Sequence, residues 1–167
     1  ESSKVVNTPY DDVFRTLLND CSSLIIPVIN EIFDERYSGD EEIVFLPETH
    51  FLNQQDGGEE KRITDASFKI VGREEKKFLY ECQSTADSSM LVRIFEYSTQ
   101  IALDQGEITG NQLKVEIPHS AVLFLRCKDT TPDKMMIEMK TPGGTVCFDV
   151  MVMKSQRYGI DKIFEKK

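Results

Sequence analysis

Two polar residues, Glu81 and Gln83, end a strand-like run that leads directly into a helix-like one, in the stretch FLYECQSTADSSMLVRIFEY (residues 78–97). Alternate residues of a strand share one face of a sheet, so these two are expected to be neighbours. Folding the preceding strand over Gly72 brings Asp65 level with them. Two carboxylates from neighbouring strands provide the hard-oxygen geometry that Mg²⁺ or Mn²⁺ favours. The same spacing also fits an exposed acidic end of a hairpin, and spacing alone leaves both interpretations open.

The net charge bears on which partners such a site could have. Lys and Arg number 20 against 29 Asp and Glu, which gives a formal net charge of −9. A net charge of that sign opposes loose, sequence-independent attraction to polyphosphates. It does not exclude a nucleic-acid substrate, because an active site is local and divalent cations neutralise both the carboxylates and the phosphate. The four cysteines form no C-x-x-C pair, so we expect buried thiols and no zinc site.

The composition is that of a globular domain, with 40% of the 167 residues hydrophobic and 29% charged. We expect one domain over residues 1–167. No apolar run is long enough to span a bilayer, and the start ESSKVVNTPY lacks the apolar core of a signal peptide, so we expect a cytoplasmic protein without a membrane partner. The last residues, YGIDKIFEKK, begin a helix-like pattern that stops abruptly, so we expect the natural chain to continue past Lys167.

The elements that position the polar residues follow from hydrophobic periodicity. Apolar spacing predicts two helices within residues 11–33, with Pro27 in the first turn of the second helix and Ser22 or Ser23 as its cap. A continuous apolar run at residues 120–127 predicts a strand covered on both faces. The fold class is therefore α/β (α+β), a mixed central sheet flanked by helices. The other predicted elements are a strand in EEIVFLPETHFLN, strands at 62–71 and 77–84, a helix at 88–105, and a hairpin at 135–154 that turns at Pro142-Gly143-Gly144.

The segment ITDASFKI…FLYECQSTADSSMLVRIFEYSTQIAL resembles the PD-(D/E)XK nuclease superfamily, specifically the transposase-like branch related to recombination-promoting nucleases. That branch carries an Asp, then Glu-x-Gln in place of Glu-x-Lys, then an Arg and a Tyr on the following helix. The opening NTPYDDVFRTLLNDCSSLIIPVINEIF is also similar to that branch, so the resemblance covers most of the chain. The matching positions are Asp65, Glu81, Gln83, Arg93 and Tyr97.

The resemblance implies a restriction-endonuclease-like core and a Mg²⁺-dependent endonuclease that hydrolyses phosphodiester bonds in DNA, tied to a mobile element or to recombination. Asp65 and Glu81 would hold Mg²⁺ (or Mn²⁺), which lowers the pKa of a bound water. Gln83 would position water or phosphate, because an amide donates and accepts hydrogen bonds but carries no charge. Arg93 is the expected source of the missing positive charge, with Tyr97 one helical turn beyond it.

Each supporting residue has a plainer interpretation. Arg93 could instead pair with Glu96 or Asp87, and Tyr97 could pack in the core. Glu31 could supply a third carboxylate from the N-terminal helix, or lie on a solvated helix face.

Glu48 is a similar candidate to Glu31, and His50 and His119 are expected to be ordinary surface or hydrogen-bonded histidines. The expected partners are DNA, with RNA not separated from it by the sequence, and a second copy of the chain in a homodimer. The alternative function is a catalytically weak or inactive nuclease-fold module for binding or assembly, which the acidic charge and Gln83 both favour.

Overall fold

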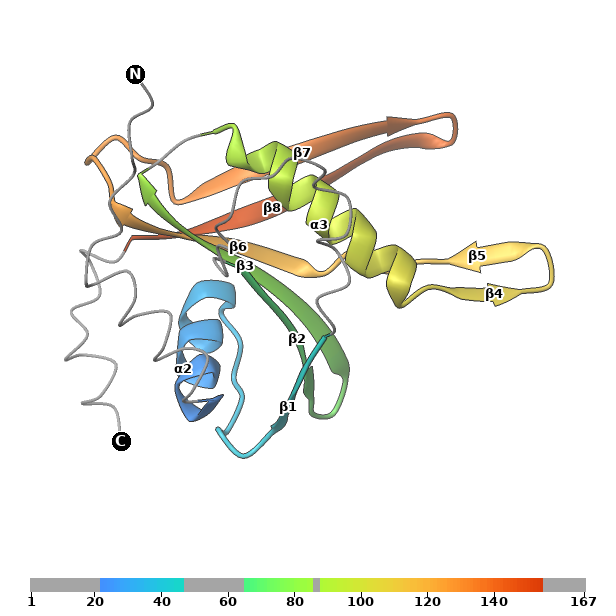
Figure 1. Cartoon of the computed structure of the whole chain (residues 1–167), viewed down its shortest axis with the longest axis horizontal. Coiled ribbons are helices and arrows are strands. Elements are labelled where there is room, and N and C mark those ends of the chain that lie inside the picture. Colours follow the sequence, from blue (N-terminus) through green and yellow to red (C-terminus); the bar gives the residue numbers. More distant parts are fainter. Residues whose placement is uncertain (1–21, 47–64, 86–87, 155–167) are drawn as a thin grey trace, which may run out of the picture.

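The computed structural model describes residues 22–46, 65–85 and 88–154, and shows two helices and eight strands in these segments (Figure 1). Their bounds are α2 Ser22–Phe33, β1 Glu42–Phe45, β2 Asp65–Val71, β3 Glu75–Thr85, α3 Met90–Asp104, β4 Glu107–Thr109, β5 Gln112–Lys114, β6 His119–Arg126, β7 Lys134–Thr141 and β8 Gly144–Lys154. Residues 1–21, which include the start of the predicted helical region 11–33, lie outside the described residues. The same is true of residues 47–64, with Glu48 and His50, of residues 86–87, with Asp87, and of the residues after Lys154.

Six strands form one mixed sheet in the order β1-β2-β3-β6-β8-β7. The first three strands pair antiparallel, β3, β6 and β8 run parallel, and β7 pairs antiparallel with β8. Because β3 and β6 are parallel, the chain must cross over between them, and this crossover contains α3 followed by β4 and β5. The prediction of a mixed sheet with flanking helices is confirmed at this level. The strand predicted at 120–127 is the inner strand β6; its residues 120–124 are buried, whereas Arg126 is exposed and Cys127 lies beyond the strand.

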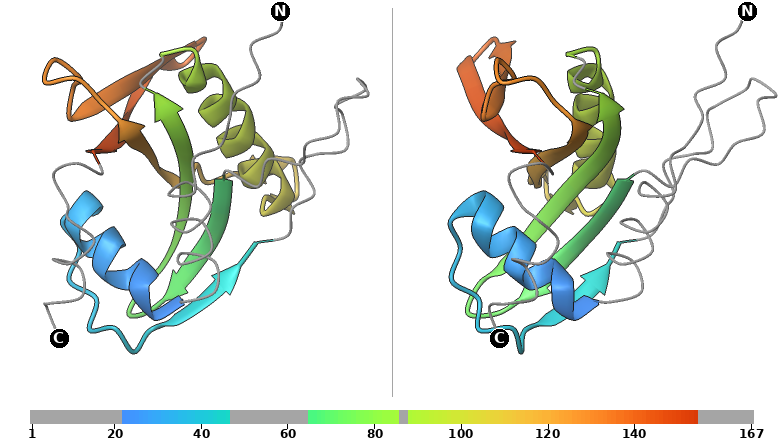
Figure 2. Two further views of the ribbon diagram at one scale, coloured as in Figure 1. Left: turned by 60° about the vertical axis from the view of Figure 1, so that its left-hand side comes forward. Right: turned by 90° about the vertical axis from the view of Figure 1, so that its left-hand side faces the viewer.

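The two helices cover opposite faces of the sheet, as Figure 2 shows. One face carries a cluster centred on Phe68 and Phe78, against which α2 packs through Ile25 and Ile29. The other face carries a second cluster with α3; its buried members include Leu79, Met90, Ile94, Val122 and Phe124. Successive residues of β3 point to opposite faces, so Phe78 belongs to the α2 side while Leu79 belongs to the α3 side.

Pro27 differs from its predicted place. It lies inside α2 rather than in the first turn, and its side chain is exposed. A proline in a helix interior removes one backbone hydrogen bond and crowds the preceding turn. The helix continues because Ile25, Ile26 and Ile29 around it are buried against the sheet, and tertiary packing of an apolar face contributes more to helix stability than local propensity does.

A further hairpin, β4–β5, was not predicted. The two strands have three residues each and project away from the main sheet in Figure 1. Thr109 pairs with Gln112, and the turn between them is made by Gly110, at φ 60°, and Asn111. Three-residue strands are too short to show a reliable alternation of apolar and polar residues, so the sequence pattern contained little signal.

The prediction of buried cysteines is wrong for the two that can be assessed. Cys127 is only partly buried and Cys147 is exposed on the β7–β8 hairpin. This hairpin extends past the rest of the sheet, so neither face of its outer part is covered (Figure 1). Within the described residues, no helix is long and apolar enough to cross a membrane.

Candidate functional site

Strand β3 carries the motif residues on the face that α3 covers. In the β2–β3 ladder the Cα partner of Glu81 is Asp65, as the turn at Gly72 predicted. Residues that are directly opposite in an antiparallel pair occupy the same face of the sheet. On its other side β3 pairs with β6, where Val122 is level with Glu81 and Phe124 is level with Gln83. The backbone therefore puts position 65, at the start of β2, opposite position 81, and position 83 lies two residues further along β3.

The carboxylate of Glu81 is fully buried, with 0% of its side chain exposed. It lies between Leu79 and Gln83 along the strand face, and Leu79 and the neighbouring Val122 belong to the apolar cluster on this side. Burial raises the pKa of Glu81 above its ordinary value, while Arg93 and the hydrogen bond from Gln83 act in the opposite direction. The acid is thus held in an environment that disfavours its charge unless a cation is close.

Arg93 is that cation in the structure. Its Nη2 lies 2.6 Å from Oε1 of Glu81, and its side chain is 44% exposed. The ion pair shown for Arg93 is with Glu81, not with the predicted alternative Glu96. Arg93 is in the first turn of α3, between the buried Met90 and Ile94, at the edge of the face that packs on the sheet. Its guanidinium can therefore reach a buried carboxylate while part of the side chain remains in solvent.

The two oxygens of Glu81 have different partners. Oε1 accepts a hydrogen bond from Nε2 of Gln83 at 3.2 Å as well as the contact from Arg93. Oε2 is buried, and within the described part of the chain it has no hydrogen-bond partner. Most buried polar atoms in folded proteins have a partner, so an unpartnered carboxylate oxygen requires a specific explanation. One explanation is that this oxygen is a ligand position.

The donor set fits a hard cation only in part. Glu81 Oε2 is a buried carboxylate oxygen, and the backbone register puts Asp65 opposite Glu81. Mg²⁺ is commonly bound by one or two carboxylates together with water. Among the described residues there is no group of three or more His, Cys, Asp or Glu that could hold a metal. A metal at this position would thus depend on Glu81 and Asp65, with Gln83 beside it.

Two other predicted residues differ in where the structure puts them. Tyr97 lies one turn beyond Arg93 on α3 and packs, partly buried, against the apolar cluster of that side. This contact agrees with the alternative interpretation of Tyr97, in which it packs in the core. Glu31 is exposed on α2, which covers the other face of the sheet, so the structure does not bring it together with Glu81.

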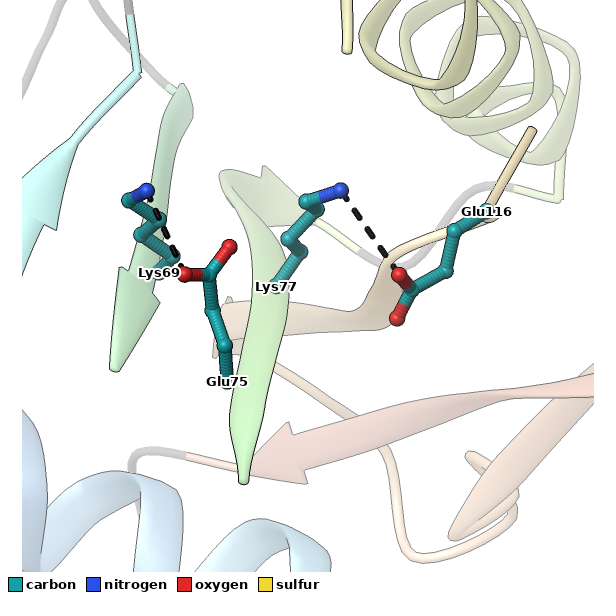
Figure 3. Close-up of polar contacts among 4 residues, drawn as sticks. All are labelled: Lys69, Glu75, Lys77 and Glu116. Carbon is teal, nitrogen blue, oxygen red and sulfur yellow. Dashed lines mark hydrogen bonds and ion pairs between the residues drawn. The ribbon is translucent and has the colours of Figure 1, made fainter. Parts of the chain in front are cut away.

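Nearby lysines are paired with acids at some distance from Glu81. Lys69 and Lys77 are opposite each other in the β2–β3 ladder, four register steps from the Asp65–Glu81 pair. Lys69 contacts Glu75 at 3.4 Å, and Lys77 contacts Glu116 at 3.6 Å; both ion pairs are drawn in Figure 3. Pairing with separate acids relieves the repulsion between these two like charges. Arg93 is therefore the cation that neutralises Glu81.

Sequence reasoning did not single out Lys154, which is 5% exposed at the end of β8. Gln83, Phe124 and Lys154 form one row across β3, β6 and β8, so Lys154 is about 10 Å from Gln83 by strand spacing. Its Nζ donates to the carbonyl oxygen of Thr131 and lies 3.2 Å from Oδ1 of Asp133. The lysine thus anchors the β6–β7 connection. In the sequence, the feature that could have indicated its burial is a lysine at the end of an apolar strand.

The site as a whole is a buried carboxylate beside an amide and a partly exposed arginine. One oxygen of the carboxylate is paired with the arginine, and the other has no partner among the residues that the structure describes. The site could bind a divalent cation, hold an anionic group through Arg93, or serve as a buried ion pair that orients α3 on the sheet. Comparisons with protein-family models, with curated proteins and with solved structures found no match to this chain.

Proposed function

We propose that this chain is a metal-dependent endonuclease domain that cleaves phosphodiester bonds in DNA and is associated with a mobile element or with recombination. The observation that carries the proposal is the position of Glu81: it is opposite Asp65, fully buried, and has one carboxylate oxygen without a partner among the described residues. The strand–turn–strand–helix context that accompanies the motif is also present, as β2, β3 and α3. A restriction-endonuclease-like core is part of the same proposal.

In this function Asp65 and Glu81 would hold Mg²⁺ or Mn²⁺, and the metal would polarise the phosphate of the substrate and lower the pKa of a bound water. Gln83 orients water or a phosphate oxygen, and it does so as a neutral group that can both donate and accept. Arg93 contributes the positive charge that glutamine lacks. The apolar cluster between α3 and the sheet excludes water around Glu81, and this strengthens every charge interaction of the carboxylate.

The test is cleavage of supercoiled DNA, single-stranded DNA and RNA by the full-length protein, in Mg²⁺ and in Mn²⁺ at low salt. Glu81→Gln should abolish cleavage, because the neutral amide keeps the shape but loses the anionic ligand. Glu75→Gln is the matched control, since Glu75 is an exposed acid on the same strand and the same face. Cleavage by wild type and by Glu75→Gln, but not by Glu81→Gln, is the expected result.

Gln83 gives a second, independent test. Gln83→Leu should lower the rate because both hydrogen-bonding functions are lost, whereas Gln83→Lys should preserve or raise it by adding positive charge next to the scissile phosphate. If the wild-type protein and Gln83→Lys are both inert on every substrate and in both metals, the nuclease assignment is wrong.

One observation favours a second candidate, a nuclease-fold module that binds or assembles without cleaving. The Arg93–Glu81 pair already neutralises the carboxylate, as a structural ion pair would in a domain that no longer binds metal. The net charge of −9 also opposes binding to nucleic acid. Under this alternative, neither Mn²⁺ nor Mg²⁺ binds at millimolar concentration, and Glu81→Gln changes only stability.

A further inference from the structure

We propose that Arg93 is a gate on Glu81 that a divalent cation opens: the guanidinium neutralises the carboxylate when no metal is bound and is released by the metal to hold a phosphate group of the nucleic-acid strand. The inference starts from the asymmetry of the carboxylate. Two donors, Arg93 and Gln83, converge on Oε1, whereas Oε2 is buried and has no partner among the described residues.

Charge decides which groups can share Glu81. A buried carboxylate is stable when one cation neutralises it, but a second cation at the same carboxylate is repelled by the first in a medium of low polarity. Magnesium binds oxygen at about 2.1 Å, and Arg93 Nη2 is already 2.6 Å from Oε1. A metal on Glu81 and a guanidinium on Glu81 would therefore lie within a few ångströms of each other, and the two compete.

The side chain of Arg93 can move away from the ion pair, whereas that of Glu81 cannot. The arginine side chain is 44% exposed and begins in the first turn of α3, so its guanidinium can turn into solvent without displacing the apolar residues beneath the helix. Glu81 is fixed on an inner strand between β2 and β6. Gln83 is neutral, so it can stay beside the carboxylate in either state.

Gln83 carries no charge, so its hydrogen bond to Glu81 adds no second cation at the carboxylate. The positive charge that the described residues place beside Glu81 is that of Arg93, and it becomes available to a phosphate group when metal binds. A guanidinium is planar and presents paired donors, which match a phosphate group better than an ammonium does.

The competition predicts a rise in metal affinity when Arg93 is removed. Mn²⁺ binding to the full-length protein would be measured by calorimetry and by the Mn²⁺ paramagnetic resonance signal, for wild type, Arg93→Met and Arg93→Lys. Arg93→Met should bind Mn²⁺ about tenfold more tightly or more, within the usual range of coupling between two sites. Arg93→Lys, which keeps a charge without the planar fork, should fall between the two and covers the case in which Arg93→Met does not fold.

Arg73→Met is the matched control, because Arg73 is an exposed arginine in the turn at the opposite end of the β2–β3 hairpin. It removes the same overall charge and should leave Mn²⁺ affinity unchanged. The phosphate step, which rests on the proposed function, is tested with a short DNA strand in Ca²⁺. Wild type should bind the strand more tightly with Ca²⁺ than without it, and Arg93→Met should lose that gain.

The outcomes separate the gate from the nuclease proposal. If Glu81→Gln abolishes Mn²⁺ binding but Arg93→Met leaves the affinity unchanged or lowers it, the metal site stands and the gate is overturned. If Arg93→Met binds Mn²⁺ more tightly but DNA binding in Ca²⁺ does not depend on Arg93, the competition stands and the phosphate role is wrong. If wild type, Glu81→Gln and Arg93→Met all fail to bind Mn²⁺, both proposals fail.

Discussion

The two faces of β3 are packed in different ways. On the α2 side, Phe68 and Phe78 are stacked at 5.8 Å between ring centroids and the buried residues of the cluster are all apolar. On the α3 side, the buried residues include Glu81 and a hydrogen-bonded serine pair, Ser98 and Ser120. Burying polar groups costs free energy unless each finds a partner, and Glu81 Oε2 has none in the described residues. The side with polar residues in its core is therefore the side where we expect function.

The contrast also separates stability from chemistry within one strand. We expect substitutions on the α2 side to change only the stability of the fold, because the aromatic and aliphatic side chains there contribute packing and no charge. The α3 side should respond to charge, to metal and to pH, because its buried groups include an ionisable one. Changes on each side therefore test whether this division is real.

The largest effect is expected from Phe78→Ala. Phe78 is fully buried, its ring is 5.2 Å from that of Phe33, and it stacks on Phe68. Truncation should lower the free energy of unfolding by about 3 to 5 kcal/mol, because it removes a buried ring and leaves a cavity. Urea denaturation measures the loss. Mn²⁺ affinity of the folded fraction should not change; a change would mean that the two faces are not independent.

Arg93→Met should have the next largest effect in the absence of metal. It leaves the carboxylate of Glu81 buried without its cation, which should cost about 1 to 3 kcal/mol at neutral pH. Urea denaturation with and without Mn²⁺ measures this. Saturating Mn²⁺ should restore much of the lost stability, because a ligand that binds only the folded state stabilises it. Equal stability of Arg93→Met and wild type without metal would show that the ion pair contributes nothing.

Ser98→Ala should have a smaller effect, about 1 kcal/mol. The hydroxyl of Ser120 donates to the carbonyl oxygen of Pro118, so Ser98 is the donor in the 3.2 Å Ser98–Ser120 hydrogen bond. Removing Ser98 leaves an acceptor without its donor, between α3 and β6. Thermal and urea unfolding would measure the loss, and the double change Ser98→Ala with Ser120→Ala should not add a second full loss. Additive losses would show that the two hydroxyls do not interact.

Glu81→Gln should have the smallest effect near pH 4.5, and the effect should grow with pH. Burial raises the pKa of Glu81 above the ordinary value of 4.5. The folded state therefore holds the proton more tightly than the unfolded state, and wild-type stability falls as pH rises from 4.5 through the raised pKa. The amide variant lacks this loss, so its stability relative to wild type should increase over that interval. A difference that stays constant with pH, measured by urea unfolding without metal, would contradict this.

The local elements of the motif and their order could be predicted from the sequence alone. The alternation in β3, the turn at Gly72 and the helical spacing after residue 88 were sufficient to place Glu81 and Gln83 on one face and Asp65 opposite Glu81. These features depend on interactions between residues that are close along the chain, which a periodic pattern records directly. The continuous apolar run of β6 likewise predicted a strand covered on both faces.

Which charged side chains form ion pairs could not be predicted from the sequence, because it depends on how the elements pack. The pairing of Arg93 with Glu81, instead of Glu96, depends on how α3 is rotated over β3, and this rotation is set by the packing of Met90, Ile94 and Ile101 on the sheet. The separation of Glu31 from Glu81 depends on which face α2 covers. Both are consequences of long-range packing, in which many apolar contacts fix the position of a helix. This position then determines which polar side chains are close enough to interact.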